Sequence, residues 1–104
     1  MSRSHIRARI RTYLYWLNTP NKHWPKEEIV KYSAVEYVVG ELDKRLVCRK
    51  TMEPNDILKQ FEDEMVRRYN TISEELSKCD DLVLFCATAL NVIEELEVSY
   101  FDIN

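Results

Sequence analysis

Hydrophobic residues recur along the chain at intervals of three and four, the spacing that places side chains on one face of an α-helix. Near the amino terminus, Ile6, Ile10 and Leu14 form such a stripe, which predicts a helix over residues 4–18. A second helix is predicted over residues 25–48, where the apolar spacing alternates between three and four. This alternation is typical of a helix packed against another helix, and its members are Tyr32, Val35, Val39, Leu42 and Leu46.

The carboxyl-terminal half predicts two further helices, over residues 54–73 and 80–98. The first of these has one apolar side, formed by Ile57, Leu58, Phe61, Met65, Tyr69 and Ile72. In the second, apolar residues from Leu82 to Leu96 cover a much wider arc of the helix. A helix that is apolar over so much of its circumference is expected to be the most buried element of the fold.

The connections between these helices are short, which suits antiparallel neighbours in a bundle. One glycine and three prolines in 104 residues leave few tight turns, which argues against a many-stranded β-fold. We therefore predict an all-α protein, a four-helix up-down bundle that forms a single helical domain over residues 1–104.

The helix predicted over residues 25–48 has a second apolar face, and Gly40 lies within it. A glycine in the middle of a helix costs about 1 kcal/mol relative to alanine, so we expect another helix to approach closely there. That helix belongs to the same chain, to a protein partner or to a second copy. The residues of this candidate protein interface are Val30, Tyr37, Val38 and Gly40, extended by Trp24, Tyr100 and Phe101.

Charge is divided unevenly between the two halves of the chain. Residues 1–52 hold eleven Lys and Arg against five Asp and Glu, a charge of +6, whereas residues 53–104 hold four against thirteen, a charge of −9. Cations begin the first helix and anions end the fourth, and each group opposes the dipole of its own helix. Since these ends meet at one pole of an up-down bundle, we expect the two groups to compensate each other: Arg3, Arg7, Arg9 and Arg11, and Glu94, Glu95 and Glu97.

The same division of charge leaves two other functions open. The arginines of the first helix, with Trp16 nearby, offer direct binding of RNA or DNA, because guanidinium and aromatic groups contact unpaired bases. The acidic second half repels phosphate, so we rank nucleic-acid binding below the alternatives. The other alternative is an inhibitor whose acidic helical surface imitates nucleic acid and blocks a basic nucleic-acid-binding enzyme. Its candidate residues are Glu62, Asp63, Glu64, Glu74, Glu75, Asp80 and Asp81.

Motifs for catalysis or cofactor binding are not found in the sequence. His5 and His23 stand in no metal-binding spacing. Cys48, Cys79 and Cys86 lack a CxxC spacing, which argues against a zinc site and a disulfide framework and for reduced thiols. Cys86 lies within the apolar arc of the fourth helix, so we expect burial to raise its pKa. We expect no cofactor, no metal, no small-molecule ligand and no enzymatic activity.

No stretch of the sequence approaches the ~18 consecutive apolar residues of a membrane-spanning helix, so we expect no membrane partner. Arginines interrupt every apolar run near the amino terminus, which argues against a secretion signal. The sequence therefore predicts a non-enzymatic, cytoplasmic helical module that binds a protein partner or a second copy of itself.

Overall fold

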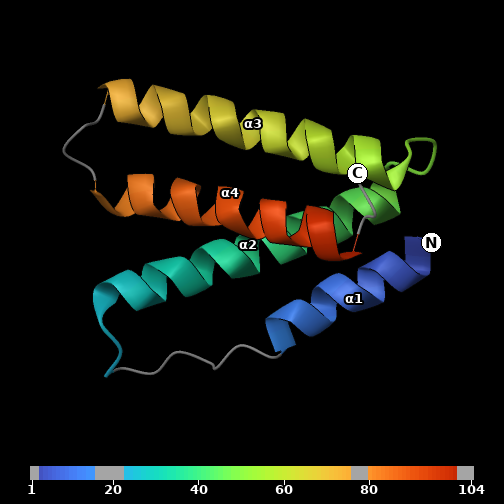
Figure 1. Ribbon diagram of the computed structural model, residues 1–104, viewed down its shortest axis with the longest axis horizontal. Coiled ribbons are helices and arrows are strands. Elements are labelled where there is room, and N and C mark those ends of the chain that lie inside the picture. The colour runs from blue at the N-terminus through green and yellow to red at the C-terminus, as the bar shows by residue number, and fades with distance from the viewer. Residues whose placement is uncertain (1–2, 16–22, 76–79, 101–104) are drawn as a thin grey trace.

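The computed structural model describes residues 3–15, 23–75 and 80–100, with the backbone alone described for residues 73–75, 80, 99 and 100 (Figure 1). Four helices are observed: α1 (Arg3–Tyr15), α2 (Lys26–Cys48), α3 (Pro54–Glu75) and α4 (Asp80–Tyr100). The predicted all-α bundle is confirmed, and the predicted helix bounds agree to within two residues wherever the chain is described. Residues 16–18 of the first predicted helix lie outside the described ranges.

Helices α2 and α3 both begin beside a proline. Pro54 is the first residue of α3, a position where the missing N–H of proline has no intrahelical partner to lose. Pro25 instead precedes α2, and its carbonyl oxygen accepts hydrogen bonds from the N–H groups of Glu28 and Ile29 at 3.1 and 3.2 Å. The sequence predicts that α2 begins at Pro25, whereas the helix begins one residue later, at Lys26. Proline is tolerated both at the first position of a helix and just before it.

Successive helices run antiparallel, as predicted for an up-down bundle (Figure 1). The most extensive helix contact joins α2 and α4, which run parallel to each other. Helix α4 lies in front of α2 in Figure 1, with α3 and α1 on its two sides. One side of α4 is therefore turned away from the other described helices.

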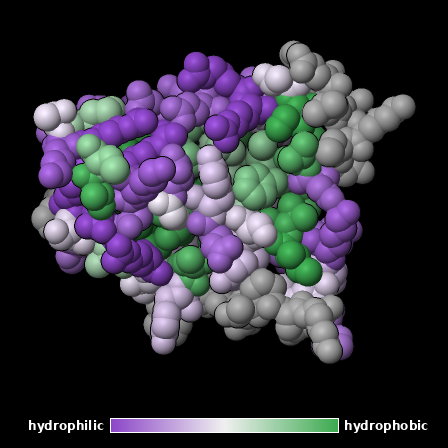
Figure 2. All heavy atoms as spheres, turned by 180° about the vertical axis from the view of Figure 1, so that it is seen from behind, coloured by the Kyte–Doolittle hydropathy of each residue, from purple (hydrophilic) through white to green (hydrophobic). Residues whose placement is uncertain are grey.

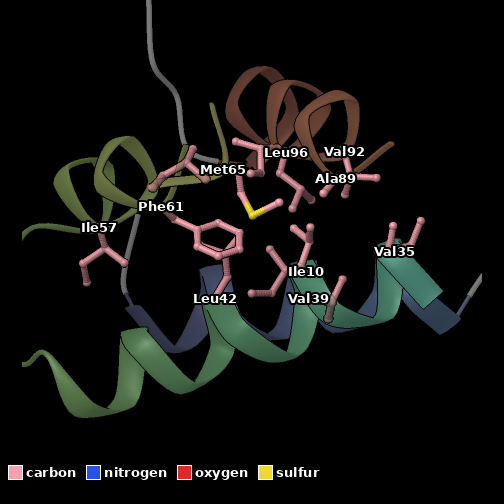
Figure 3. Close-up of a cluster of buried hydrophobic side chains, with 14 of the residues drawn as sticks. Ile10, Val35, Val39, Leu42, Ile57, Phe61, Met65, Ala89, Val92 and Leu96 are labelled. Atoms are coloured by element: carbon pink, nitrogen blue, oxygen red, sulfur yellow. The ribbon is translucent and has the colours of Figure 1, made fainter. Parts of the chain in front are cut away.

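All four helices contribute side chains to one hydrophobic core (Figure 3). Phe61 and Met65 of α3 occupy its centre, and each is 1% exposed. Full burial of a side chain of this size contributes roughly 1.5–3 kcal/mol. The predicted stripes of the first three helices supply most of the remaining buried residues: Ile6, Ile10, Val35, Val39, Leu42, Leu46, Ile57 and Leu58.

Helix α4 carries more apolar surface than the core takes up. Its buried side holds Cys86, Ala89, Val92, Ile93 and Leu96. Leu82 near its start is 43% exposed, however, and Val98 near its end is 74% exposed. The expectation that this helix is the most buried element is therefore wrong among the described side chains, because α2 buries more residues.

The face of the molecule opposite to that in Figure 1 is largely hydrophilic, with separate hydrophobic groups (Figure 2). Ile29 and Val47 are exposed near the two ends of α2, and Gly40 between them is exposed too. A Cβ atom at Gly40 would meet nothing within 4 Å. The predicted close approach of another helix at Gly40 is therefore wrong for the helices that the structure describes.

Replacement of Gly40 by alanine should stabilise the protein. The new methyl group enters open space, and alanine reduces the conformational entropy of the unfolded chain, so we expect a gain of about 0.5–1 kcal/mol in the free energy of unfolding. Urea unfolding measures the change, with Lys44→Ala as a control at another exposed position of α2. A loss of stability in Gly40→Ala would show that an atom does pack against the glycine.

Candidate functional site

Two arginines of α1 are held by one carboxylate of α2. Arg7 donates from Nε to Oδ1 of Asp43 at 2.8 Å, and Arg11 donates from Nη2 to Oδ2 of Asp43 at 2.9 Å. The hydrogen bond from Arg7 is the largest cause that holds the pKa of Asp43 below its usual value, and the bond from Arg11 adds to it. Asp43 therefore fastens α1 to α2.

The guanidinium group of Arg3 closes the carboxyl end of α2. Its Nη1 donates to the carbonyl oxygens of Leu46 and Arg49 at 2.9 and 3.2 Å. Its Nη2 donates to the carbonyl oxygens of Lys50 and Met52. The last carbonyls of a helix have no partner within the helix and carry the negative end of its dipole. The end of α2 thus stabilises a cation that the dipole of α1 disfavours.

The predicted compensation between these arginines and the carboxylates that end α4 is wrong in its partners. The start of α1 and the end of α4 do share one pole of the bundle (Figure 1). Three of the four arginines repeat every four residues, however, and their partners lie on α2 and in the turn that follows it. Tyr13, on another side of α1, donates from its hydroxyl to Oε2 of Glu95 at 2.5 Å. Arg9 lies one turn before Tyr13 and is exposed.

Arg45 of α2 is the one charged residue that the fold buries among the described residues. Its Nε donates to Glu41 at 3.0 Å, and its Nη2 donates to Glu64 of α3. The guanidinium group also stacks on Phe61, 4.6 Å from the ring centroid. The hydrogen bond from Arg45 holds the pKa of Glu64 below its usual value. Glu64 therefore links α2 to α3 and is not part of a free acidic surface, contrary to the prediction.

The other residues predicted to imitate nucleic acid are divided as well. Asp81 is paired with Lys26 at 2.7 Å, a contact that joins the starts of α4 and α2. Glu62 and Asp63 remain on α3 without a cationic partner among the described residues. The remaining members have side chains outside the part of the chain that the structure describes: Glu74, Glu75 and Asp80.

Glu62 and Asp63 of α3 and Glu94 and Glu97 of α4 form a cluster that we call the acidic surface. Burial raises the pKa of Glu62, and the nearby carboxyl group of Glu97 raises it further. The charges of Asp63 and Glu94 act in the same direction. No ion pair joins any of the four to another described residue. Like charges are thus gathered at the contact of two helices.

The outward side of α4 carries a regular set of residues that we call the outer stripe: Leu84, Ala87, Asn91 and Val98. Their offsets of 0, 3, 7 and 14 positions place them on one face of the helix. Leu84 and Ala87 are half-buried without belonging to the core cluster, and Asn91 is exposed. Beside the stripe lies an open depression of about 500 Å³, lined by Asn91, Glu94, Glu95 and Val98. This face was not singled out from the sequence, because the apolar arc considered there runs through the core residues Cys86, Ala89 and Ile93 instead.

The interface predicted on α2 is not observed as one surface. Val38 is fully buried. The ring of Tyr37 packs at 6.1 and 5.7 Å from those of Phe61 and Phe85, and its hydroxyl accepts a hydrogen bond from Arg68 at 3.1 Å. Trp24 and Val30 are half-buried, and Gly40 is exposed. The side chains of Tyr100 and Phe101 lie outside the part of the chain that the structure describes.

The predicted rise in the pKa of the Cys86 thiol is confirmed, and burial is its cause. Cys48 is exposed, and Cys79 lies outside the described residues. Within the described ranges, no three His, Cys, Asp or Glu side chains are placed to hold a metal ion. Across the same residues, no helix combines the length and the hydropathy needed to cross a membrane.

Comparisons with protein-family models, with curated proteins and with solved structures each find no significant match to this chain. The geometry of the described side chains therefore carries the functional argument. Its two main features are the acidic surface and the outer stripe of α4.

Replacement of Asp43 by asparagine should weaken the attachment of α1. We expect the free energy of unfolding to fall by roughly 1 kcal/mol near neutral pH, since both arginines lose their charged acceptor. The pKa of Asp43 is lowered in the folded protein, so its contribution is present above the usual value of 3.8 and is lost as the pH falls further. Urea unfolding at neutral and acidic pH should show a loss that shrinks in acid. An equal loss at both pH values, or in the exposed control Glu36→Gln, would contradict this assignment.

Replacement of Glu62 by glutamine should stabilise the protein. It removes a like charge from the acidic surface, so we expect a gain of about 0.2–0.5 kcal/mol near neutral pH. The pKa of Glu62 is raised in the folded protein, so its charge costs stability at higher pH, and the cost disappears as the pH falls to the usual value of 4.5. Thermal unfolding across this range should show a gain that vanishes in acid. Destabilisation at neutral pH would mean that the carboxylate has a cationic partner.

Proposed function

We propose that this protein is a non-enzymatic helical module that binds a basic protein partner through the acidic surface of α3 and α4. The observation that carries the proposal is the grouping of Glu62, Asp63, Glu94 and Glu97 where α3 packs against α4, with no ion pair to any of the four from a described residue. Gathering like charges opposes folding, and local rules of this kind are broken mainly at functional sites. A basic partner supplies the missing cations.

The use of cations elsewhere in the protein supports this choice of surface. Arg7 and Arg11 are bound to Asp43, and Arg45 is bound to Glu64. These ion pairs neutralise charge on α2 and along its contacts with α1 and α3. Glu62 and Asp63 of α3 and Glu94 and Glu97 of α4 have no ion pair with a described residue, so their charge is available to a partner.

The two other functions that the sequence leaves open differ in support. Imitation of nucleic acid is a special case of the proposal, because a nucleic-acid-binding enzyme is one kind of basic partner; the acidic surface, rather than Glu64 or Asp81, then provides the negative charge. Direct binding of RNA or DNA by α1 has less support, because its arginines already form hydrogen bonds within the chain. Arg3 donates to carbonyl oxygens at the end of α2, and Arg7 and Arg11 donate to Asp43. We further propose a cytoplasmic location, which the free thiols of Cys48 and Cys86 support.

The proposal is tested with a fluorescent oligo-lysine peptide as the basic probe. The double variant Glu94→Gln/Glu97→Gln removes two charges from the acidic surface, and the double variant Glu27→Gln/Glu36→Gln removes two exposed charges from α2. At about 0.5 kcal/mol for each exposed pair, the first variant should raise the Kd of the probe about five-fold, whereas the second should change it little. Fluorescence anisotropy measures both values at low and at physiological salt.

Equal weakening in the two double variants would show that net charge alone attracts the probe, and it would overturn the proposal. The same conclusion would follow if a single-stranded RNA bound more tightly than oligo-lysine and lost its affinity in Arg9→Gln/Arg11→Gln. That result would assign α1 to nucleic-acid binding. Circular dichroism confirms that each variant is folded before its affinity is compared.

A further inference from the structure

The outer stripe of α4 has the spacing by which one helix packs against another. From Leu84, its members follow after three, four and seven residues, and Glu94 and Glu95 fall within the longest interval. Alternation of three and four is the seam of helix-on-helix packing. The opposite side of α4 already packs in the core, so this seam is a second one on the same helix. No described helix lies over it (Figure 1).

The stripe changes in character along its length. Its first half is apolar and half-buried, with the small residue Ala87 one turn after Leu84. Its second half lines the open depression of about 500 Å³ together with two carboxylates, and Val98 there is 74% exposed. A ligand that matches both halves has an apolar side along its length and cations at one end.

Resting on the proposed function, we propose that the basic partner docks an amphipathic helix along the outer stripe of α4. Its apolar side chains contact Leu84, Ala87 and Val98, and its lysine or arginine side chains pair with Glu94 and Glu95. A helix laid into a groove in this way is a common mode of peptide recognition. The charge pairs select the partner, and the apolar contacts exclude water from them.

The charge of α4 also sets the direction of the docked helix. The carboxyl end of α4 carries both the negative end of its dipole and the carboxylates of the depression. The amino end of a helix carries the positive end of its dipole. An antiparallel partner therefore brings its positive end and its basic residues together over Glu94 and Glu95.

A second copy of this chain does not fit the stripe. Two α4 helices packed in parallel would place Glu94 and Glu95 against the same residues of the other copy. Packed antiparallel about Asn91, they would place Glu95 against Ala87 and Glu94 against Thr88, which leaves both charges without cationic partners. Charge complementarity therefore selects a different, basic partner.

Two synthetic peptides of identical composition test the inference. One has leucines on a single helical face and lysines in its first half, and the other has the same residues permuted so that the leucines are spread around the helix. We expect the amphipathic peptide to bind about ten-fold more tightly in fluorescence anisotropy, and Leu84→Asp to abolish this advantage. Ala87→Glu provides a second variant on the stripe, and Val47→Asp is a control at an exposed apolar residue of α2.

The outcomes separate the inference from the function on which it rests. Equal binding of the two peptides, unaffected by Leu84→Asp and Ala87→Glu, would overturn the docked helix and leave the acidic surface as the binding site. Binding of neither peptide, with no response of oligo-lysine to Glu94→Gln/Glu97→Gln, would overturn both.

Two further measurements test the direction and the occupant. A peptide with its lysines in the second half should bind more weakly, and equal affinity would overturn the antiparallel direction. Light scattering should show one mass for the protein over a wide range of concentration. A dimer that is lost in Leu84→Asp would identify a second copy as the occupant and overturn the proposal.

Discussion

Packing between α2 and α4 is the constraint on which the rest of the structure depends. Both helices contribute small, fully buried residues to the core, with Ala34 in α2 and Ala89 in α4. Small side chains let the axes of two helices approach, and this pair forms the most extensive contact in the bundle. Helices α1 and α3 then lie to either side, and one face of α4 is left uncovered by the described helices.

Helix α2 also carries the polar contacts that fix the two flanking helices. Asp43 holds two arginines of α1, and Arg45 reaches Glu64 of α3 while it stacks on Phe61. Isolated contacts of this kind contribute modestly to stability when they are exposed, but they define which faces of the helices meet. The carboxylates at the contact of α3 and α4, by comparison, have no ion-pair partner among the described residues.

Hydrophobic spacing predicted the helices well because it reflects local geometry, and the stripes through Ile10, Leu42 and Phe61 are buried as expected. Partners of charged residues depend on how each helix is rotated in the bundle, and no local pattern records that rotation. The arginines of α1 were therefore placed at the correct pole but against the wrong helix. The same reason explains α2, where Val38 is buried and Gly40 is exposed, and α4, whose outward face was not predicted.

The distribution of paired and unpaired charge affects how the protein is oriented when it meets a charged molecule. A formal net charge of −3 understates its field, because the cations bound to Asp43 and Glu64 are neutralised locally while the carboxylates beside Glu97 are not. These carboxylates give the surface at the contact of α3 and α4 a locally negative potential. A diffusing cationic body therefore exerts a torque on the protein and turns that side to the front before the surfaces touch, which increases the fraction of productive collisions at low ionic strength.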